Sequence, residues 1–164
     1  MAILYLAMVF KKLLTKEQAL QKAKHYCGYQ ERSHSEVKEK LYSLGLYKQQ
    51  VEECLSQLIE ENYLNEERFA IQFAGGKFRM NQWGKVKILY ALKEKKLSEY
   101  CIRKAIGQID KDDYEKTLKD LLLKKYNLLK DDELPVRKKK VINYLIQKGF
   151  ESDLVYTAVS SHVE

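Results

Sequence analysis

Apolar residues recur along most of the chain at steps of three and four, the spacing that places side chains on one face of an α-helix. Val37, Leu41 and Leu44 follow this step, and the segment from Val51 to Leu58 repeats it. Only one Pro and seven Gly interrupt the 164 residues, which favours helices joined by short turns. The pattern predicts helices at residues 15–28, 33–44, 48–62, 65–80, 82–94, 98–108, 112–127, 134–148 and 151–162.

Six apolar positions recur twice later in the chain, at offsets of 51 and then 53 residues. The three sets are Val37, Leu41, Leu46, Val51, Cys54 and Leu55; Ile88, Leu92, Leu97, Ile102, Ala105 and Ile106; and Val141, Leu145, Phe150, Val155, Ala158 and Val159. Such a period groups the helices in threes, and each unit is small for an independent core. We therefore expect an all-α fold of three tandem three-helix repeats, stacked into an elongated, curved array.

Capping residues support the predicted helix boundaries. Thr15 and Ser33 each precede a Gln or Glu by three residues, the spacing of a capping box at a helix start. Gly45 and Gly149 follow the second helix of their repeats, where helices often end on a left-handed residue.

These signals divide the chain into four segments. We expect a hydrophobic N-terminal arm at 1–14, the first repeat at 15–64, a basic second repeat at 65–110 and the third repeat at 111–164. The arm is too short to span a bilayer and lacks the marks of a signal peptide. It could pack on the body, pair with another copy, or be an extended start upstream of Met8, and the sequence leaves these three options open.

Basic residues concentrate in the second repeat. The chain has a net charge of +7, and residues 76–104 hold nine basic against two acidic residues. A second basic run follows at 137–140. Such clusters favour a polyanion or an acidic partner, although any single Lys is more simply a solvated surface residue. The candidate partner-binding or DNA-binding surface comprises Lys77, Arg79, Trp83, Lys85, Lys87, Lys93, Lys95, Lys96, Arg103, Lys104, Arg137 and Lys138.

Two roles are open for Trp83, the only tryptophan, which lies among these cations. It could stack on a base or anchor an interface, or it could cover the seam between the fourth and fifth predicted helices. Phe69, Phe73 and Phe78 follow near-helical steps and are interpreted as core residues.

The sequence shows no arrangement typical of catalysis. The three His residues lack paired metal-ligand spacing, and Walker and nucleophile-elbow motifs are absent. Cys27, Cys54 and Cys101 are widely separated and are expected to be small apolar fillers, which suits a reducing cytoplasm. We therefore predict a cytoplasmic binding protein that is not an enzyme and uses no metal or cofactor.

Three stretches carry a family resemblance. Residues 32–41 resemble the pattern R-S-x-x-E-L-x-x-K-L, and residues 63–70 resemble Y-L-D-D-x-x-F-A with Asn65 at an acidic position. The middle repeat follows R-x-x-x-x-G-x-x-x-I-x-x-E-L with Gly84 and Ile88 in register, although Tyr90-Ala91 stands where an acidic residue is usual. In their order and spacing, these stretches resemble the RecX family of bacterial recombinase regulators, over about residues 15–162.

The resemblance implies a regulator that binds the RecA recombinase, chiefly as its filament on single-stranded DNA. It implies inhibition of the RecA ATPase and of strand exchange in DNA repair and recombination, with no reaction catalysed by the regulator itself. We expect a monomer, with single-stranded DNA as a possible second contact and no membrane partner. The alternative is a helical module that binds nucleic acid directly, without a recombinase partner.

Overall fold

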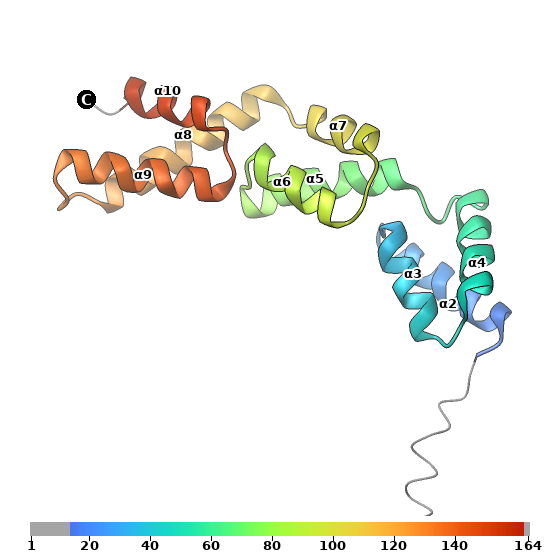
Figure 1. Cartoon of the computed structure of the whole chain (residues 1–164). Helices are drawn as coiled ribbons and strands as arrows, with labels where there is room; N and C mark the ends of the chain where they lie inside the picture. Colours follow the sequence, from blue (N-terminus) through green and yellow to red (C-terminus); the bar gives the residue numbers. More distant parts are fainter. Residues whose placement is uncertain (1–13, 163–164) are drawn as a thin grey trace, which may run out of the picture. The chain divides into compact units, whose positions relative to one another are not determined.

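The computed structural model describes residues 14–162, and within this range the chain is all-helical and contains no β-strand (Figure 1). The helices are α2 (Lys16–Tyr29), α3 (His34–Ser43), α4 (Lys48–Glu60), α5 (Glu66–Asn81), α6 (Lys85–Glu94), α7 (Glu99–Gly107), α8 (Lys111–Leu128), α9 (Leu134–Lys148) and α10 (Ser152–His162). The predicted all-α class is confirmed. Apart from Leu14, the expected N-terminal arm lies outside the described residues.

The helices belong to two compact units. Unit 1 ends at Phe69 and contains α2, α3 and α4, whereas unit 2 begins at Ala70 and contains most of α5 and the helices from α6 to α10. The repeat boundaries expected after residues 64 and 110 stay a prediction.

The core of unit 1 is formed by the apolar faces of its three helices together with the turns between them. Helices α2 and α3 begin at capping residues as predicted, because Thr15 and Ser33 both form complete capping boxes. At the other end of the unit, Arg68 Nε donates to a Glu31 carboxylate oxygen over 2.5 Å and ties α5 to the loop after α2.

The repeating apolar positions form the core in both units. Sixteen of the eighteen residues in the three predicted sets are buried, and the other two, Ile106 and Ala158, are partly buried. Equivalent positions of the three sets therefore pack into the core in the same way.

The turns after α3, α6 and α9 share one backbone conformation. Gly45 and Gly149 have φ values of 95° and 93°, as predicted for helix ends. The equivalent residue after α6 is Lys96, which has a φ of 60°. A side chain in the left-handed region costs about 1 kcal/mol, so the middle turn carries strain that glycine relieves in the other two.

The start of α6 differs from the prediction. The helix was expected from residue 82 but begins at Lys85. Gln82 has a φ of 53°, which ends the path of α5, and Gly84 then adopts an extended conformation as the N-cap of α6. Trp83 therefore lies in a short connection between two helices.

Two glycines join the start of α6 to the turn after α9. The Gly84 amide donates to the Lys148 carbonyl over 2.9 Å, and the Val86 amide donates to the Gly149 carbonyl over 3.0 Å. Free N–H groups of one helix start are thus satisfied by carbonyls at the end of another. A Cβ atom on Gly84 would lie 2.1 Å from the Gly149 backbone, so only glycine allows this approach.

Aromatic rings fill the space beside this junction. The Tyr114 ring of α8 lies 5.7 Å from Phe78 and 5.1 Å from Phe150, measured between centroids. Its hydroxyl accepts from the Lys85 amide over 2.9 Å and donates to Glu151 over 2.5 Å. Burial, with the Glu151 hydrogen bond as a second cause, raises the pKa of the Tyr114 hydroxyl far above its usual value, so the hydroxyl remains a donor.

Candidate partner-binding surface

Trp83 lies between two lysines contributed by different helices. Lys77 Nζ, from α5, is 5.0 Å from the ring, and Lys87 Nζ, from α6, is 4.7 Å from it. The Trp83 amide also donates to the Lys77 carbonyl over 3.3 Å, which fixes the connection against the end of α5. The ring is partly buried, and both cations lie within the range of a cation–π interaction.

The same pattern continues along α5 to Phe73. Lys77 Nζ lies 5.3 Å from the Phe73 ring as well, and Lys95 Nζ, from the turn after α6, lies 6.0 Å from it. Phe73 is partly exposed, whereas Phe69 and Phe78 are buried as predicted. Lys77 thus links two rings.

From Lys87 the series of contacts continues to α9 and α8. Lys87 Nζ donates to the Gln147 carbonyl over 3.4 Å, and Lys148 Nζ donates back to the Asn81 carbonyl over 3.2 Å. Next along α9, the Tyr144 ring has Lys148 Nζ at 5.9 Å and Lys125 Nζ, from α8, at 5.3 Å.

These contacts form a series that runs from one side chain to the next, which we call the cation–aromatic ladder. Its members, all partly exposed, are Lys95, Phe73, Lys77, Trp83, Lys87, Lys148, Tyr144 and Lys125. The lysine stems cover the rings while the ammonium groups reach solvent. The ladder can therefore present several fixed positive charges together with flat apolar surface.

Counter-charges are scarce at the ladder. In the part of the chain that the structure describes, Lys77, Lys87, Lys125 and Lys148 form no ion pair with a carboxylate. Uncompensated cations at fixed positions favour an anionic ligand or an acidic protein surface.

Other predicted site residues make different contacts. Lys93 and Arg103 share Glu99, at 3.6 Å and 3.9 Å, and Lys104 Nζ lies 5.7 Å from the Tyr100 ring. Their positive charge is partly compensated, since Glu99 is opposite in sign to both of its partners.

Arg79 and Lys85 also point elsewhere. Arg79 is two residues from Lys77 on the same helix and lines a hollow with Asp110 and Asp113. Lys85 Nζ lies 4.6 Å from the ring of Tyr114. Lys96 is exposed in the turn after α6.

In the third predicted repeat, Arg137 stacks on Tyr126 with its guanidinium carbon 3.3 Å from the ring, and its Nε donates to the Tyr126 carbonyl over 2.8 Å. Lys138 is partly buried in the same helix. Neither residue contacts a member of the ladder in the interactions described above. The ladder thus includes four of the twelve predicted site residues: Lys77, Trp83, Lys87 and Lys95.

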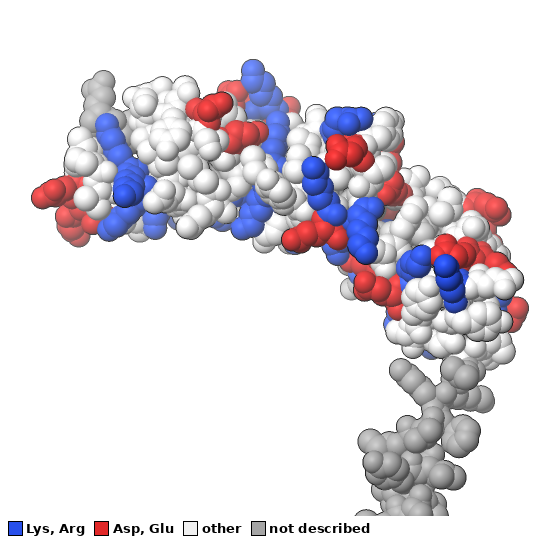
Figure 2. Space-filling model, in the orientation of Figure 1, with Lys and Arg blue, Asp and Glu red and all other residues white. Residues whose placement is uncertain are grey.

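The charge distribution on one face is visible in Figure 2. Over unit 2, Lys and Arg side chains form several groups, with acidic and uncharged surface between them. Residues 14–162 contain no helix with the length and apolar character required to cross a bilayer, and no group of His, Cys, Asp or Glu arranged to hold a metal ion.

Fold and surface together define a class: an all-helical protein built from three-helix repeats, with a cationic and aromatic face. Similarity to known protein families identifies the family within this class. The second three-helix domain of RecX matches residues 65–106, and the third matches residues 112–159. The two matches cover more than half of the 164 residues, and the chain belongs to the RecX family of regulatory proteins.

Curated relatives agree with this assignment. Regulatory protein RecX of Clostridium perfringens strain 13 is 32% identical over 124 residues, which cover 74% of this chain and 58% of that protein. Regulatory protein RecX of Prosthecochloris aestuarii is 29% identical over 138 residues, covering 84% of this chain and 89% of the relative. The chain thus spans less than two thirds of the Clostridium protein.

Two solved structures share the fold. The crystal structure of RecX from Lactobacillus salivarius has a TM-score of 0.81 at 22% identity, covering 89% of this chain and 95% of that one. A crystal structure of another regulatory protein RecX has a TM-score of 0.78 at 24% identity, covering 90% of this chain and 74% of that one. These similarities confirm the predicted helical repeat fold.

Proposed function

We propose that this chain binds the RecA recombinase, chiefly as its filament on single-stranded DNA, and inhibits ATP hydrolysis and strand exchange. Membership of the RecX family supports a regulatory role, and the resemblance of its motifs supports RecA as the partner. The chain acts by binding and catalyses no reaction itself.

The observation that carries the proposal is the cation–aromatic ladder. It lies in a strongly basic part of the chain, because residues 70–162 hold twenty Lys and Arg against twelve Asp and Glu. A protein filament on DNA exposes acidic side chains and phosphates, both of which are complementary to such a surface. The rings add apolar contact area between the charges, as aromatic residues do in many interfaces.

The mechanism is competitive and mechanical. Bound across neighbouring recombinase subunits, the regulator obstructs the addition of further subunits, the closure of the ATP sites between them, or the access of a second DNA. Inhibition therefore requires only binding energy.

Purified protein titrated into RecA and single-stranded DNA tests this proposal, with filament assembly followed by light scattering and ATP hydrolysis by phosphate release. We expect both to fall as the protein is added. Unchanged assembly and hydrolysis at every concentration would contradict the proposal.

A second candidate function is direct binding of single-stranded nucleic acid. Trp83 and Tyr144 favour it, because partly exposed rings beside lysines are typical of surfaces on which bases stack. Binding to bare DNA and to RecA-coated DNA, each over a salt series, separates the two functions. Preference for coated DNA supports the regulator, whereas equal affinities with equally steep salt dependence support the alternative.

A monomeric state and a cytoplasmic location are part of the proposal. All three cysteines are free and buried, which agrees with a reducing compartment. The proposed activity needs no metal and no cofactor from this chain.

A further inference from the structure

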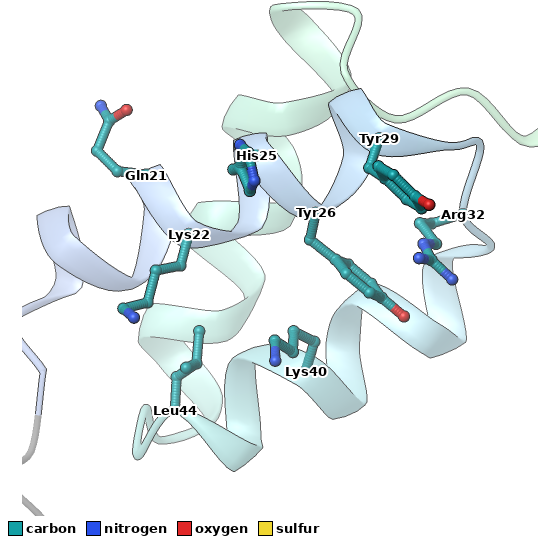
Figure 3. Close-up of a pocket in the computed structure, with 8 residues that line it drawn as sticks. All are labelled: Gln21, Lys22, His25, Tyr26, Tyr29, Arg32, Lys40 and Leu44. Atoms are coloured by element: carbon teal, nitrogen blue, oxygen red, sulfur yellow. The ribbon is translucent and has the colours of Figure 1, made fainter.

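Unit 1 has a groove between α2 and α3 that the proposed function does not use (Figure 3). The groove has a volume of about 510 Å³, and its lining includes Lys22, Tyr26, Tyr29, Arg32, Lys40 and Leu44. Figure 3 shows α2 contributing one side, with Lys40 and Leu44 on the other.

Two tyrosines give the groove its aromatic surface. The Tyr26 ring is partly exposed, with the Arg32 guanidinium carbon 3.9 Å from its centre and Lys40 Nζ 5.7 Å from it. Tyr29, one turn further along α2, is 82% exposed. An aromatic side chain exposed to this extent is available as an anchor for a binding partner.

The rim of the groove is cationic. None of the described residues that line it carries a carboxylate, and Lys22, Arg32 and Lys40 form no ion pair in the described part of the chain. Arg32 Nε is buried without a hydrogen-bond partner among the described residues. An anionic group arriving in the groove would find several unused donors.

The charge of the surrounding unit argues against a polyanion. Residues 14–69 hold eight basic against ten acidic residues, a net charge of −2. Long-range attraction for nucleic acid is therefore expected from the positive charge of unit 2, whereas the groove is a local basic site on an acidic unit. Such a site suits a ligand with a few carboxylates close to an apolar side chain.

We propose that this groove docks a short acidic and apolar segment of a partner protein. From Gln21 to Tyr29 the α2 wall runs for about 12 Å at 1.5 Å per residue, which accommodates two helical turns or about four extended residues. An apolar side chain lies against Tyr26 and Leu44, and flanking carboxylates meet Lys22, Arg32 and Lys40.

This inference goes beyond the proposed function and does not depend on it. The ladder lies in unit 2, so a regulator without groove binding, or groove binding without regulation, is a distinguishable result.

Fluorescence anisotropy with the full chain tests the groove. The probe is a fluorescein-labelled peptide of about twelve residues, in which Leu and Phe at helical spacing are separated by Glu. Three matched probes accompany it: one with Lys in place of Glu, one with Ala in place of Leu and Phe, and an oligothymidylate of equal charge. We expect the acidic and apolar peptide to bind most tightly.

The variant Tyr29→Ala with Lys22→Glu should weaken this binding by about tenfold, because it removes an exposed anchor and reverses a rim charge. Its matched control is Tyr47→Ala with Lys48→Glu, which changes an exposed pair in the same unit outside the groove and should alter affinity less than about twofold. The ladder variant Lys77→Ala, Lys87→Ala and Lys125→Ala should keep the full Tyr29-dependent binding.

Several results would overturn the proposal. These are failure of the acidic peptide to bind, equal binding to the groove variant and the wild type, and a Tyr29-dependent preference for oligothymidylate. A self-associating chain whose dimer is lost in the groove variant would make a second copy the occupant. Much tighter peptide binding after removal of residues 1–13 would make that segment the occupant.

Discussion

At the scale of single residues, the position of Trp83 is compatible with both roles that its sequence position leaves open. The ring is partly buried in the connection between α5 and α6, as a residue covering a seam would be. It also lies within 5.0 Å of Lys77 Nζ and 4.7 Å of Lys87 Nζ, where it supports two charges on the ladder. Packing and binding are therefore compatible for this side chain.

Gly84 lies so close to the backbone of Gly149 that a side chain at this position would collide with it. We expect Gly84→Ala to lower the free energy of unfolding by at least about 2 kcal/mol, because the new Cβ collides with the Gly149 backbone and separates the two hydrogen-bonded helix ends. Urea denaturation followed by circular dichroism measures this loss.

Gly76→Ala is the control for that substitution. Nothing lies within 4 Å of a Cβ at this position inside α5, so alanine should stabilise the chain by about 0.5 to 1 kcal/mol. Equal stability of the Gly84→Ala variant and the wild type would contradict the account of the junction.

At the scale of elements, the ladder depends on how four helices present their side chains. α5 and α6 hold Phe73, Lys77 and Lys87 around Trp83, and the contact between Lys87 and Gln147 continues the surface to α9. The ladder therefore requires the Gly84 junction, because that junction sets the start of α6 against the end of α9.

Trp83 fluorescence reports the charge of the ladder directly, since the chain has one tryptophan. We expect iodide to quench Trp83 more than caesium does, because the flanking lysines attract anions. In the Lys77→Ala and Lys87→Ala variant the difference should shrink markedly. A Lys93→Ala and Arg103→Ala variant, whose lost cations pair with Glu99, should quench like the wild type. Equal iodide and caesium quenching in the wild type would contradict a locally positive ladder.

The sequence predicts the helices well because each apolar stripe is a local pattern. It also predicts the left-handed turns at Gly45 and Gly149, whereas the equivalent strain at Lys96 has no signal in the residue type. The largest displacement of a boundary, at the start of α6, follows from the backbone conformation at Gln82, a residue compatible with a helix interior.

The candidate site is harder to predict, because a linear basic cluster does not specify a face. Arg79 belongs to the cluster but points away from Lys77, as a two-residue step on a helix requires. Lys125 and Lys148 join the ladder through Tyr144 and lie far from the cluster in sequence. Phe73 has core spacing yet is partly exposed beneath two lysines. A search for aromatic residues at the edge of each predicted core could have found the rings of Phe73 and Tyr144.

At the scale of the whole molecule, charge is divided between the two units. Residues 14–69 have a net charge of −2, whereas residues 70–162, with twenty basic and twelve acidic residues, have a net charge of +8. We therefore expect any attraction to a charged filament to act mainly on unit 2, and we expect the contacts of unit 1 to have a different chemistry.

The affinity for the RecA filament should fall steeply with salt. If the five lysines of the ladder each replace a counterion, the logarithm of the binding constant falls with the logarithm of salt concentration with a slope of about 3.5 to 4.5. The Lys77→Ala, Lys87→Ala and Lys125→Ala variant should reduce this slope by about 2 to 3. Identical slopes for variant and wild type would exclude these lysines from the contact.

Steady-state ATP hydrolysis by RecA on single-stranded DNA, measured with that triple variant, tests whether the ladder is the surface that inhibits RecA. Its matched control carries Lys93→Ala, Arg103→Ala and Lys104→Ala, which remove the same charge from unit 2 outside the ladder. We expect the wild type and the control to inhibit hydrolysis equally, and we expect that at least about tenfold more of the folded ladder variant is needed for the same inhibition. Full inhibition by the folded ladder variant, or equal loss in the control, would contradict this expectation.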